Sequence, residues 1–170
     1  MDKAIITTML IVISMVTGIL LFNAAYPAII ESSDAMTSMT SRVDEQMKSQ
    51  ISIIHSAGEL DSAGWWQDTN SNGNFDIFVW TKNVGATRIT AVDQADIFFG
   101  PEGNFVRIPH QSQAGGTYPY WDWQVENASE WLPTATLKIT IHYGTPLPSG
   151  RYFLKVTTPN GIADDHFFSM

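Results

Sequence analysis

The residues best suited to chemistry in this sequence form one short loop of acidic and amide side chains. The loop fits the spacing D-x-N-x-N-G-x-x-D, which places side-chain oxygens at positions 1, 3, 5 and 9 of a calcium loop and glycine at position 6. Position 7 of such loops supplies a backbone carbonyl. The predicted Ca²⁺ ligands are therefore Asp68, Asn70, Asn72, Asn74 and Asp76. Hard oxygen ligands suit calcium, and since only two of these residues carry a formal charge we expect weak affinity.

The match to a calcium loop is partial. Val79 stands at position 12, where an EF-hand has a bidentate glutamate, and the flanking segments do not form a helix pair. The alternative is an Asx-rich turn whose side chains bond to their own backbone. Both interpretations predict a stiff elbow between a helix and a strand.

Other chemistry is weakly represented. The four histidines are far apart, the chain has no cysteine, and no nucleophile, phosphate-binding or paired-carboxylate motif accompanies them. We therefore predict that the protein is not an enzyme. The aromatic run "YPYWDW" (118–123) suits either a sugar-stacking platform or a core. Asn127, in Asn-Ala-Ser, is a candidate N-glycosylation site if the chain reaches the exterior.

Length and charge limit the function classes. The 170 residues can bury one core with an appendage, and the net charge of -8 argues against binding nucleic acid, which needs a dense basic surface. Without cysteine, stability outside the cell must come from packing, cations or assembly.

The appendage is an apolar N-terminal segment. Ala4 to Ile30 contains no charged residue and, as a helix, is long enough to cross a bilayer core of about 30 Å. A cleaved signal would have a shorter apolar run and a more basic start, so we expect the segment to be retained. It is followed by an amphipathic stripe, and we predict one helix over residues 1–58. Its assembly face is predicted to comprise Ile5, Met9, Val12, Met15, Ile19, Leu20, Met36, Met39, Val43, Met47, Ile51 and Ile54.

The second half has the pattern of a β domain. Short β-rich runs alternate with Gly, Pro and Asn turns, and in "LKITIHY" (137–143) apolar and polar residues alternate strictly. Seven or eight such strands predict an immunoglobulin-like antiparallel β-sandwich over residues 75–170. Residues 59–74 are predicted to be the linker that contains the cation loop. The predicted fold class is therefore α+β.

These features together resemble a known family, the archaellins and related archaellum components, which are built on a type IV pilin-like plan. The resemblance rests on "AIITTMLIVISMVTGILLF" (4–22), on "FVWTKNVGATRI" (78–89) with its K-N-x-G, and on the ending "GRYFLKVTTPNGIADDHFF". It implies a filament subunit that is held in the membrane before assembly. In the extracellular cell-surface filament its helix packs with identical subunits and its sandwich faces outward, for motility or adhesion.

Two other functions stay open. One is a membrane-anchored archaellum stator component whose sandwich binds the cell envelope or another archaellum component. The other is a calcium-dependent or sugar-binding surface adhesin, which requires the Asp68 loop or the 118–123 aromatic run to be functional. The methionine stripe favours the subunit, because a monomeric stalk gains nothing from exposing it.

Overall fold

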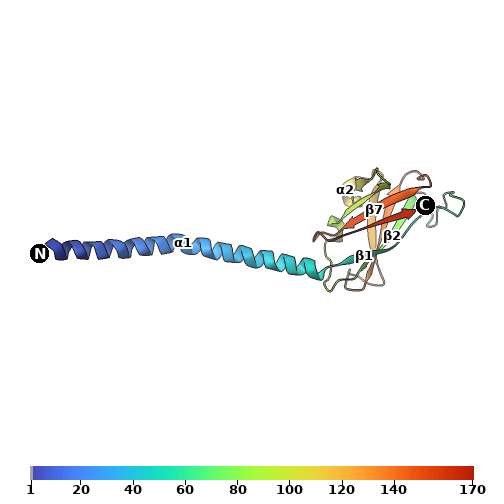
Figure 1. Cartoon of the computed structure of the whole chain (residues 1–170). Helices are drawn as coiled ribbons and strands as arrows, with labels where there is room; N and C mark the ends of the chain where they lie inside the picture. Colours follow the sequence, from blue (N-terminus) through green and yellow to red (C-terminus); the bar gives the residue numbers. More distant parts are fainter. Residues whose placement is uncertain (1) are drawn as a thin grey trace. The chain divides into compact units, whose positions relative to one another are not determined.

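The structure is a computed structural model that describes residues 2–170. One long helix, α1 (Asp2–Lys48), precedes eight strands and two short helical turns (Figure 1). The strands are β1 (Ile51–Gly58), β2 (Phe75–Asn83), β3 (Asp96–Pro101), β4 (Val106–Ile108), β5 (Tyr120–Glu126), β6 (Thr136–Tyr143), β7 (Arg151–Thr157) and β8 (Ala163–Ser169). The short turns are η1 (Val92–Gln94) and α2 (Gln111–Ala114). The predicted α+β class, with an apolar helix followed by a sandwich, is confirmed.

The chain divides into two compact units, one reaching to Asp44 and the other covering Glu45–Met170. The second unit, called the β domain below, therefore includes the last turn of α1. In the first unit, α1 has the length and apolar composition of a membrane span. Its hydroxyl side chains suit lipid, because Thr7, Ser14 and Thr17 each donate to the carbonyl four residues earlier.

The predicted C-terminal end of the helix was wrong. α1 ends at Lys48, and residues 51–58 form strand β1, so Ile51 and Ile54 do not belong to a helical stripe. Three of the four residues in "ISII" are isoleucines, whose β-branched side chains pack better on a pleated surface than on a helix. Ile51 and Ile53 are buried in the core, whereas Ile54 is exposed.

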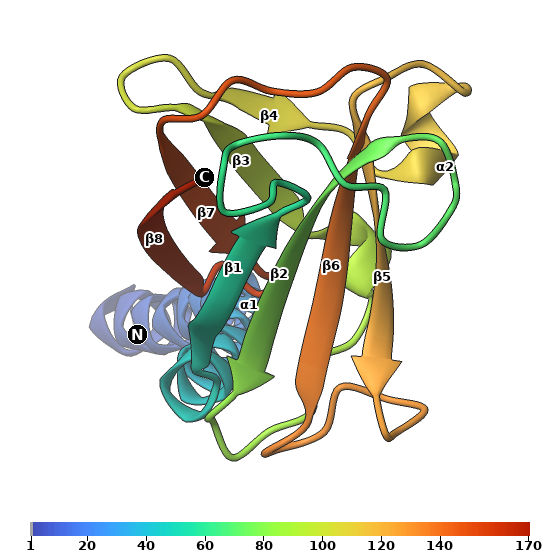
Figure 2. The same ribbon diagram turned by 90° about the vertical axis from the view of Figure 1, so that its right-hand side faces the viewer.

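The strands form two antiparallel four-stranded sheets, ordered β1-β2-β6-β5 and β4-β3-β7-β8 (Figure 2). Alternate residues of the facing strands fill the space between the sheets, among them Ile77, Ile139 and Ile141 from one and Ile97, Phe99 and Leu154 from the other. The sheet edges also bond to each other. The Ile53 N–H donates to the Asp164 carboxylate at 2.7 Å, and the Trp121 N–H donates to the Pro109 carbonyl at 3.0 Å.

The position predicted for the Asp68 loop was also wrong. Since β1 intervenes after the helix, residues 59–74 connect β1 to its antiparallel neighbour β2 and lie inside the β domain. The loop is therefore at the end of β1 that is remote from the last turn of α1. It does not act as an elbow between helix and sandwich.

The turn that follows α1, called the joint below, is held by residues in and next to the K-N-x-G run (82–85). The last helical carbonyls need donors, and the Ala86 N–H reaches the Lys48 carbonyl at 2.7 Å, while the N–H groups of Val84 and Gly85 reach the Gln50 carbonyl. Asn83 is fully buried beneath this turn. Its amide donates to the Thr87 and Trp131 carbonyls and accepts from the Gly85 N–H.

A second loop holds the same turn through side chains. The Gln46 amide donates to the Asn160 carbonyl at 3.0 Å, and the Asn160 amide donates to the Ser49 hydroxyl at 2.7 Å. That hydroxyl also pairs with Thr87 at 2.9 Å. The last turn of α1 is thus an integral part of the β domain.

Gly85 is the position in this joint where a side chain is least tolerated. A Cβ atom there would lie 2.5 Å from the Gln50 nitrogen and 2.6 Å from the Lys48 carbonyl oxygen, both of which are backbone atoms. Gly85→Ala is therefore expected to lower the free energy of unfolding of the β domain by about 3 kcal/mol. All six tryptophans lie in this domain, so their fluorescence during denaturant unfolding measures the change. Val84→Ala, at the exposed neighbouring position, is the control and should change stability by less than about 0.5 kcal/mol.

Candidate functional site

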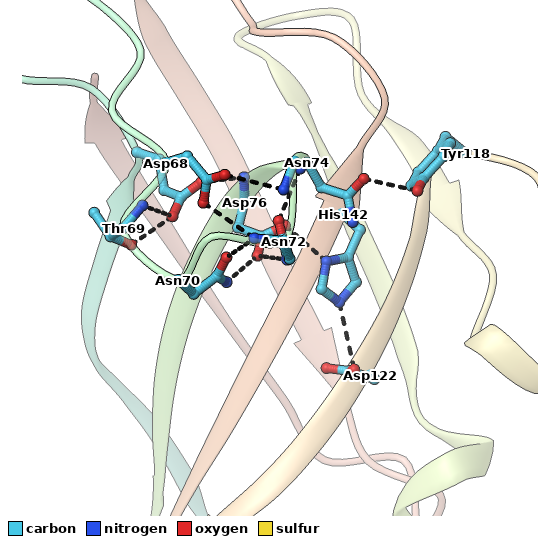
Figure 3. A network of polar contacts seen from close by, with 11 residues as sticks. Asp68, Thr69, Asn70, Asn72, Asn74, Asp76, Tyr118, Asp122 and His142 are labelled. Carbon is cyan, nitrogen blue, oxygen red and sulfur yellow. Dashed lines mark hydrogen bonds and ion pairs between the residues drawn. The ribbon is translucent and has the colours of Figure 1, made fainter.

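The polar residues of the 59–74 loop converge on one buried carboxylate, Asp76, at the start of β2 (Figure 3). One of its oxygens pairs with His142 Nδ1 at 2.7 Å, and the other accepts from the amides of Asn70 and Asn72 at 2.7 and 2.8 Å. The backbone of Asp76 bonds to Glu59 in both directions. A buried carboxylate needs such donors because an unpaired charge in the interior is costly.

Three of the predicted calcium ligands, Asp68, Asn70 and Asn72, already accept hydrogen bonds from the loop through their side-chain oxygens. Asp68 accepts from the Gly73 and Asn72 N–H groups, and the side-chain carbonyls of Asn70 and Asn72 accept from backbone N–H groups two residues later. Asn74 accepts from the Tyr118 hydroxyl at 2.7 Å, which ties the loop to the segment before β5. The geometry is that of a hydrogen-bonded Asx-rich loop.

Calcium binding stays a prediction of the sequence. Within residues 2–170 no group of three or more His, Cys, Asp or Glu side chains is arranged to hold a metal ion. A bound calcium ion would also need the Asn70 and Asn72 amides to turn their oxygens inward, away from the present hydrogen bonds. Thermal unfolding with and without millimolar calcium tests the prediction, because a ligand that binds only the folded state raises the melting temperature.

His142 joins three strands of one sheet. It lies on β6 opposite Asp76 of β2, and its Nε2 is 3.4 Å from Asp122 of β5. Burial alone would lower the pKa of His142, but the hydrogen bonds and charges of Asp122 and Asp76 outweigh burial and raise the pKa to about 9. Burial likewise opposes ionisation of Asp76, yet hydrogen bonds from His142 and Asn70 leave its pKa below the ordinary value. The side chains form a structural clip of alternating charge.

This clip predicts a pH dependence of stability. The pKa of His142 is about 9 in the folded protein and near 6.5 when unfolded, so its contribution is complete below about pH 6.5. The contribution then falls as pH rises and is lost above pH 9. The melting temperature of the wild-type protein should therefore fall between pH 6.5 and 9. In His142→Gln most of this fall should be absent. Thermal unfolding of both proteins across that range checks this, and parallel curves would contradict it.

The aromatic run 118–123 does not make one sugar platform. Trp121 is 0% exposed and belongs to the core, whereas Tyr118 and Tyr120 stack on each other with ring centroids 5.3 Å apart. Trp123 lies elsewhere, in the lining of a cavity of about 230 Å³ beside the Arg88–Glu130 ion pair. The aromatic run is therefore divided among three environments, and its Trp121 follows the core alternative.

A different set of aromatic rings is exposed on the outer face of the β4-β3-β7-β8 sheet. Phe105 packs on Phe153 with centroids 4.4 Å apart, and Phe153 packs on its cross-strand neighbour Phe167 at 5.0 Å. Arg151 covers part of Phe167 at 4.8 Å. We call Phe105, Phe153 and Phe167 the Phe ladder. Its two ends, Phe105 and Phe167, are 45% and 41% exposed.

The Phe ladder depends on a glycine. Gly100 of β3 lies opposite Phe153 of β7, and a Cβ atom at Gly100 would lie 2.7 Å from the Cα of Phe105. The missing side chain lets Phe105 fold over the sheet onto Phe153. Clustered, half-exposed aromatic rings are typical of protein interfaces, where Phe is enriched.

The remaining predicted residues are all on the surface. Asn127 is exposed, in the turn between β5 and β6, with a left-handed backbone at φ 56°. The assembly-helix positions from Ile5 to Met47 are exposed along α1, as a lipid-facing or partner-facing helix requires. Their role in assembly and the glycosylation of Asn127 stay predictions.

Comparison with known proteins identifies relatives of this arrangement. No protein-family model matches the chain. An uncharacterized protein of Archaeoglobus fulgidus is 24% identical, with 99% of each chain covered. Among solved structures, the archaellum periplasmic stator protein FlaG from Sulfolobus acidocaldarius is 26% identical with a TM-score of 0.54, covering 71% of this chain and 99% of that one.

The chain is similar to an archaellum stator protein. A second structure, the complex of stator proteins FlaF and FlaG from the same organism, matches with 28% identity and a TM-score of 0.51, covering 70% of this chain and 88% of that one. These likenesses support an archaellum component. They do not support the archaellin filament subunit that the sequence resemblance predicted first.

Sequence reasoning missed several residues of these sites. His142 and Asp122 had no recognisable motif, because they join Asp76 only through the pairing of β2, β6 and β5. Phe153 and Phe167 were visible only as ordinary outward positions of strands. The ladder could have been recognised from phenylalanines at three positions on the outward face of the sheet, because a face exposed to water usually carries polar residues.

Proposed function

We propose that this protein is a membrane-anchored stator-type component of an archaellum, with α1 in the membrane and the β-sandwich bound to another archaellum component outside it. The observation that carries the proposal is the likeness to FlaG, which exceeds 25% identity over almost the whole of that chain. The coverage, 71% of this chain, is close to the share held by the β domain. α1 would then supply the anchor. The proposal assigns the chain no catalytic step.

The joint at the end of α1 suits this function. A stator holds a fixed position against a moving part, so force must pass between its anchor and its bound partner. A flexible Gly and Ser connection would absorb that force. Here the Lys48 and Gln50 carbonyls and the Ser49 hydroxyl are all bonded within the β domain, so the last turn of α1 is held by that domain.

The Phe ladder is the surface we assign to the partner. It is a patch of aromatic rings packed on one another on the outer face of its sheet, and the ion pair of Arg151 with Glu102 borders it. An aromatic centre with a charged border has the composition of a protein–protein interface. The outer face of the other sheet is less suited, because its rings Phe78 and Trp80 are half-buried, whereas Phe105 and Phe167 are exposed.

Affinity purification from native membranes tests the proposal. A tagged chain, cross-linked in cells and extracted in detergent, should recover another archaellum component in roughly equal amount. Recovery of archaellin copies alone would support the filament subunit, and recovery of no archaellum protein would contradict the proposed function.

A further inference from the structure

The part of α1 that emerges from the membrane carries an apolar stripe. The charge-free run Ala4–Ile30 rises about 40 Å as a helix, more than the roughly 30 Å of a hydrocarbon core, so residues from Glu31 onward lie in water. In this aqueous part Met36, Met39 and Val43 are 73%, 70% and 49% exposed. Apolar side chains exposed along one face of a helix indicate a docking surface.

The stripe follows a heptad repeat. Taking Ile29 as position a, the a positions are Phe22, Ile29, Met36 and Val43, and the d positions are Ala25, Ser32 and Met39. No charged residue occupies either position in this range. The charges of the aqueous part fall at b, c, f and g: Asp44 at b, Glu31 and Glu45 at c, Asp34 and Lys48 at f, and Arg42 at g. A seam of this kind is the pattern of a two-stranded coiled coil.

Two further features agree with the same seam. Pro27, which lacks an N–H and cannot continue the helical hydrogen bonds, falls at position f on the opposite face. At the other end, the d position Gln46 donates its amide to the Asn160 carbonyl, so the seam ends at Val43 where the last turn joins the β domain. The heptad stripe thus runs from Phe22 to Val43.

A second copy of this chain fits the stripe in register. This inference rests on the membrane anchoring in the proposed function. If α1 is anchored, every copy of the chain enters the aqueous phase at the same residue and in the same direction. A second copy therefore places Met36 beside Met36 and Val43 beside Val43 without further adjustment. In this parallel pairing Arg42 at g lies near Met47 at e of its partner, so no like charges meet across the seam.

We propose that residues 22–43 of α1 form a parallel two-stranded coiled coil with a second copy of this chain. The small d residues Ala25 and Ser32 permit close approach at the membrane surface, and the β-branched Ile29 and Val43 at a favour two strands. Each dimer then presents two β domains on one paired stalk.

Single cysteines test the pairing directly, because the chain has none of its own. Met36→Cys, Met39→Cys and Val43→Cys place a thiol in the seam, where the facing Cα atoms of two strands lie within the roughly 7 Å that a disulfide spans. Ser38→Cys and Ser41→Cys, at c and f, are the matched controls on the outer face. Mild oxidation of native membranes should give at least fivefold more covalent dimer for the seam variants than for the controls.

The outcomes separate this proposal from the proposed function. Equal yields at Met36 and Ser41, no dimer at any seam position, or a ladder of higher oligomers would overturn the two-stranded coil while the chain is still in the membrane fraction. A chain absent from that fraction would overturn both proposals. Val43→Asp provides a second readout: it should abolish cross-linking through Met36→Cys while tryptophan fluorescence shows a folded β domain.

Discussion

Asp76→Ala is expected to lower the free energy of unfolding of the β domain by about 3–5 kcal/mol, because it breaks a buried ion pair and leaves two loop amides without their acceptor. His142 would lose its closer carboxylate, and the amides of Asn70 and Asn72 would lose their shared acceptor. The 59–74 loop should then detach from the sheet. Denaturant unfolding followed by tryptophan fluorescence measures the loss.

Asp68→Ala is the matched control for this effect. Its carboxylate is only half-buried and accepts from the backbone of Asn72 and Gly73, so its removal should cost about 1 kcal/mol. An equal loss for the two variants would mean that the cluster has no buried centre at Asp76. The stability difference therefore tests whether the loop is held by its carboxylate core or by its turns.

Replacing both exposed ends of the Phe ladder is expected to weaken capture of the archaellum partner at least tenfold. Phe105→Ser with Phe167→Ser removes the aromatic surface while Phe153 still covers the sheet. Aromatic residues at the centre of an interface each contribute at least about 1–2 kcal/mol to binding, and 1.4 kcal/mol is a factor of ten. The measurement is the amount of partner recovered from native membranes with the tagged variant.

Phe78→Ser is the control for the ladder variant. It removes a half-buried aromatic ring from the outer face of the other sheet, where Lys138 lies 4.4 Å above the ring. Partner recovery should be unchanged within about twofold, since a change away from the interface has little effect on affinity. An equal loss of partner recovery with the two variants would contradict the assignment of the interface to the Phe ladder.

The sequence predicted the larger architecture because its signals are periodic. A charge-free run of membrane length and strict alternation in "LKITIHY" each have one structural solution. The end of the helix was misjudged because Met47, Ile51 and Ile54 also fit helical spacing. The β-branched residues of β1 were the opposing signal, and sheet pairing with β2 decides in their favour.

The sites were less predictable because they depend on register. Asp76 faces His142 across 66 residues of sequence, which follows only once β2 pairs with β6 in the observed register. The Phe ladder likewise requires Gly100 to lie opposite Phe153. The candidate ligands of the loop were chosen from their spacing, but spacing alone does not say whether oxygens face a cation or neighbouring N–H groups.

We propose that this chain is an anchored archaellum component and not the filament subunit. Quantitative mass spectrometry of sheared filaments and of the remaining membranes from the same native cells distinguishes the two. The chain is expected to stay with the membranes, at a level well below the archaellin of the filament fraction. If the chain is instead the dominant protein of the sheared filaments, the claim is contradicted and the filament subunit is the correct interpretation.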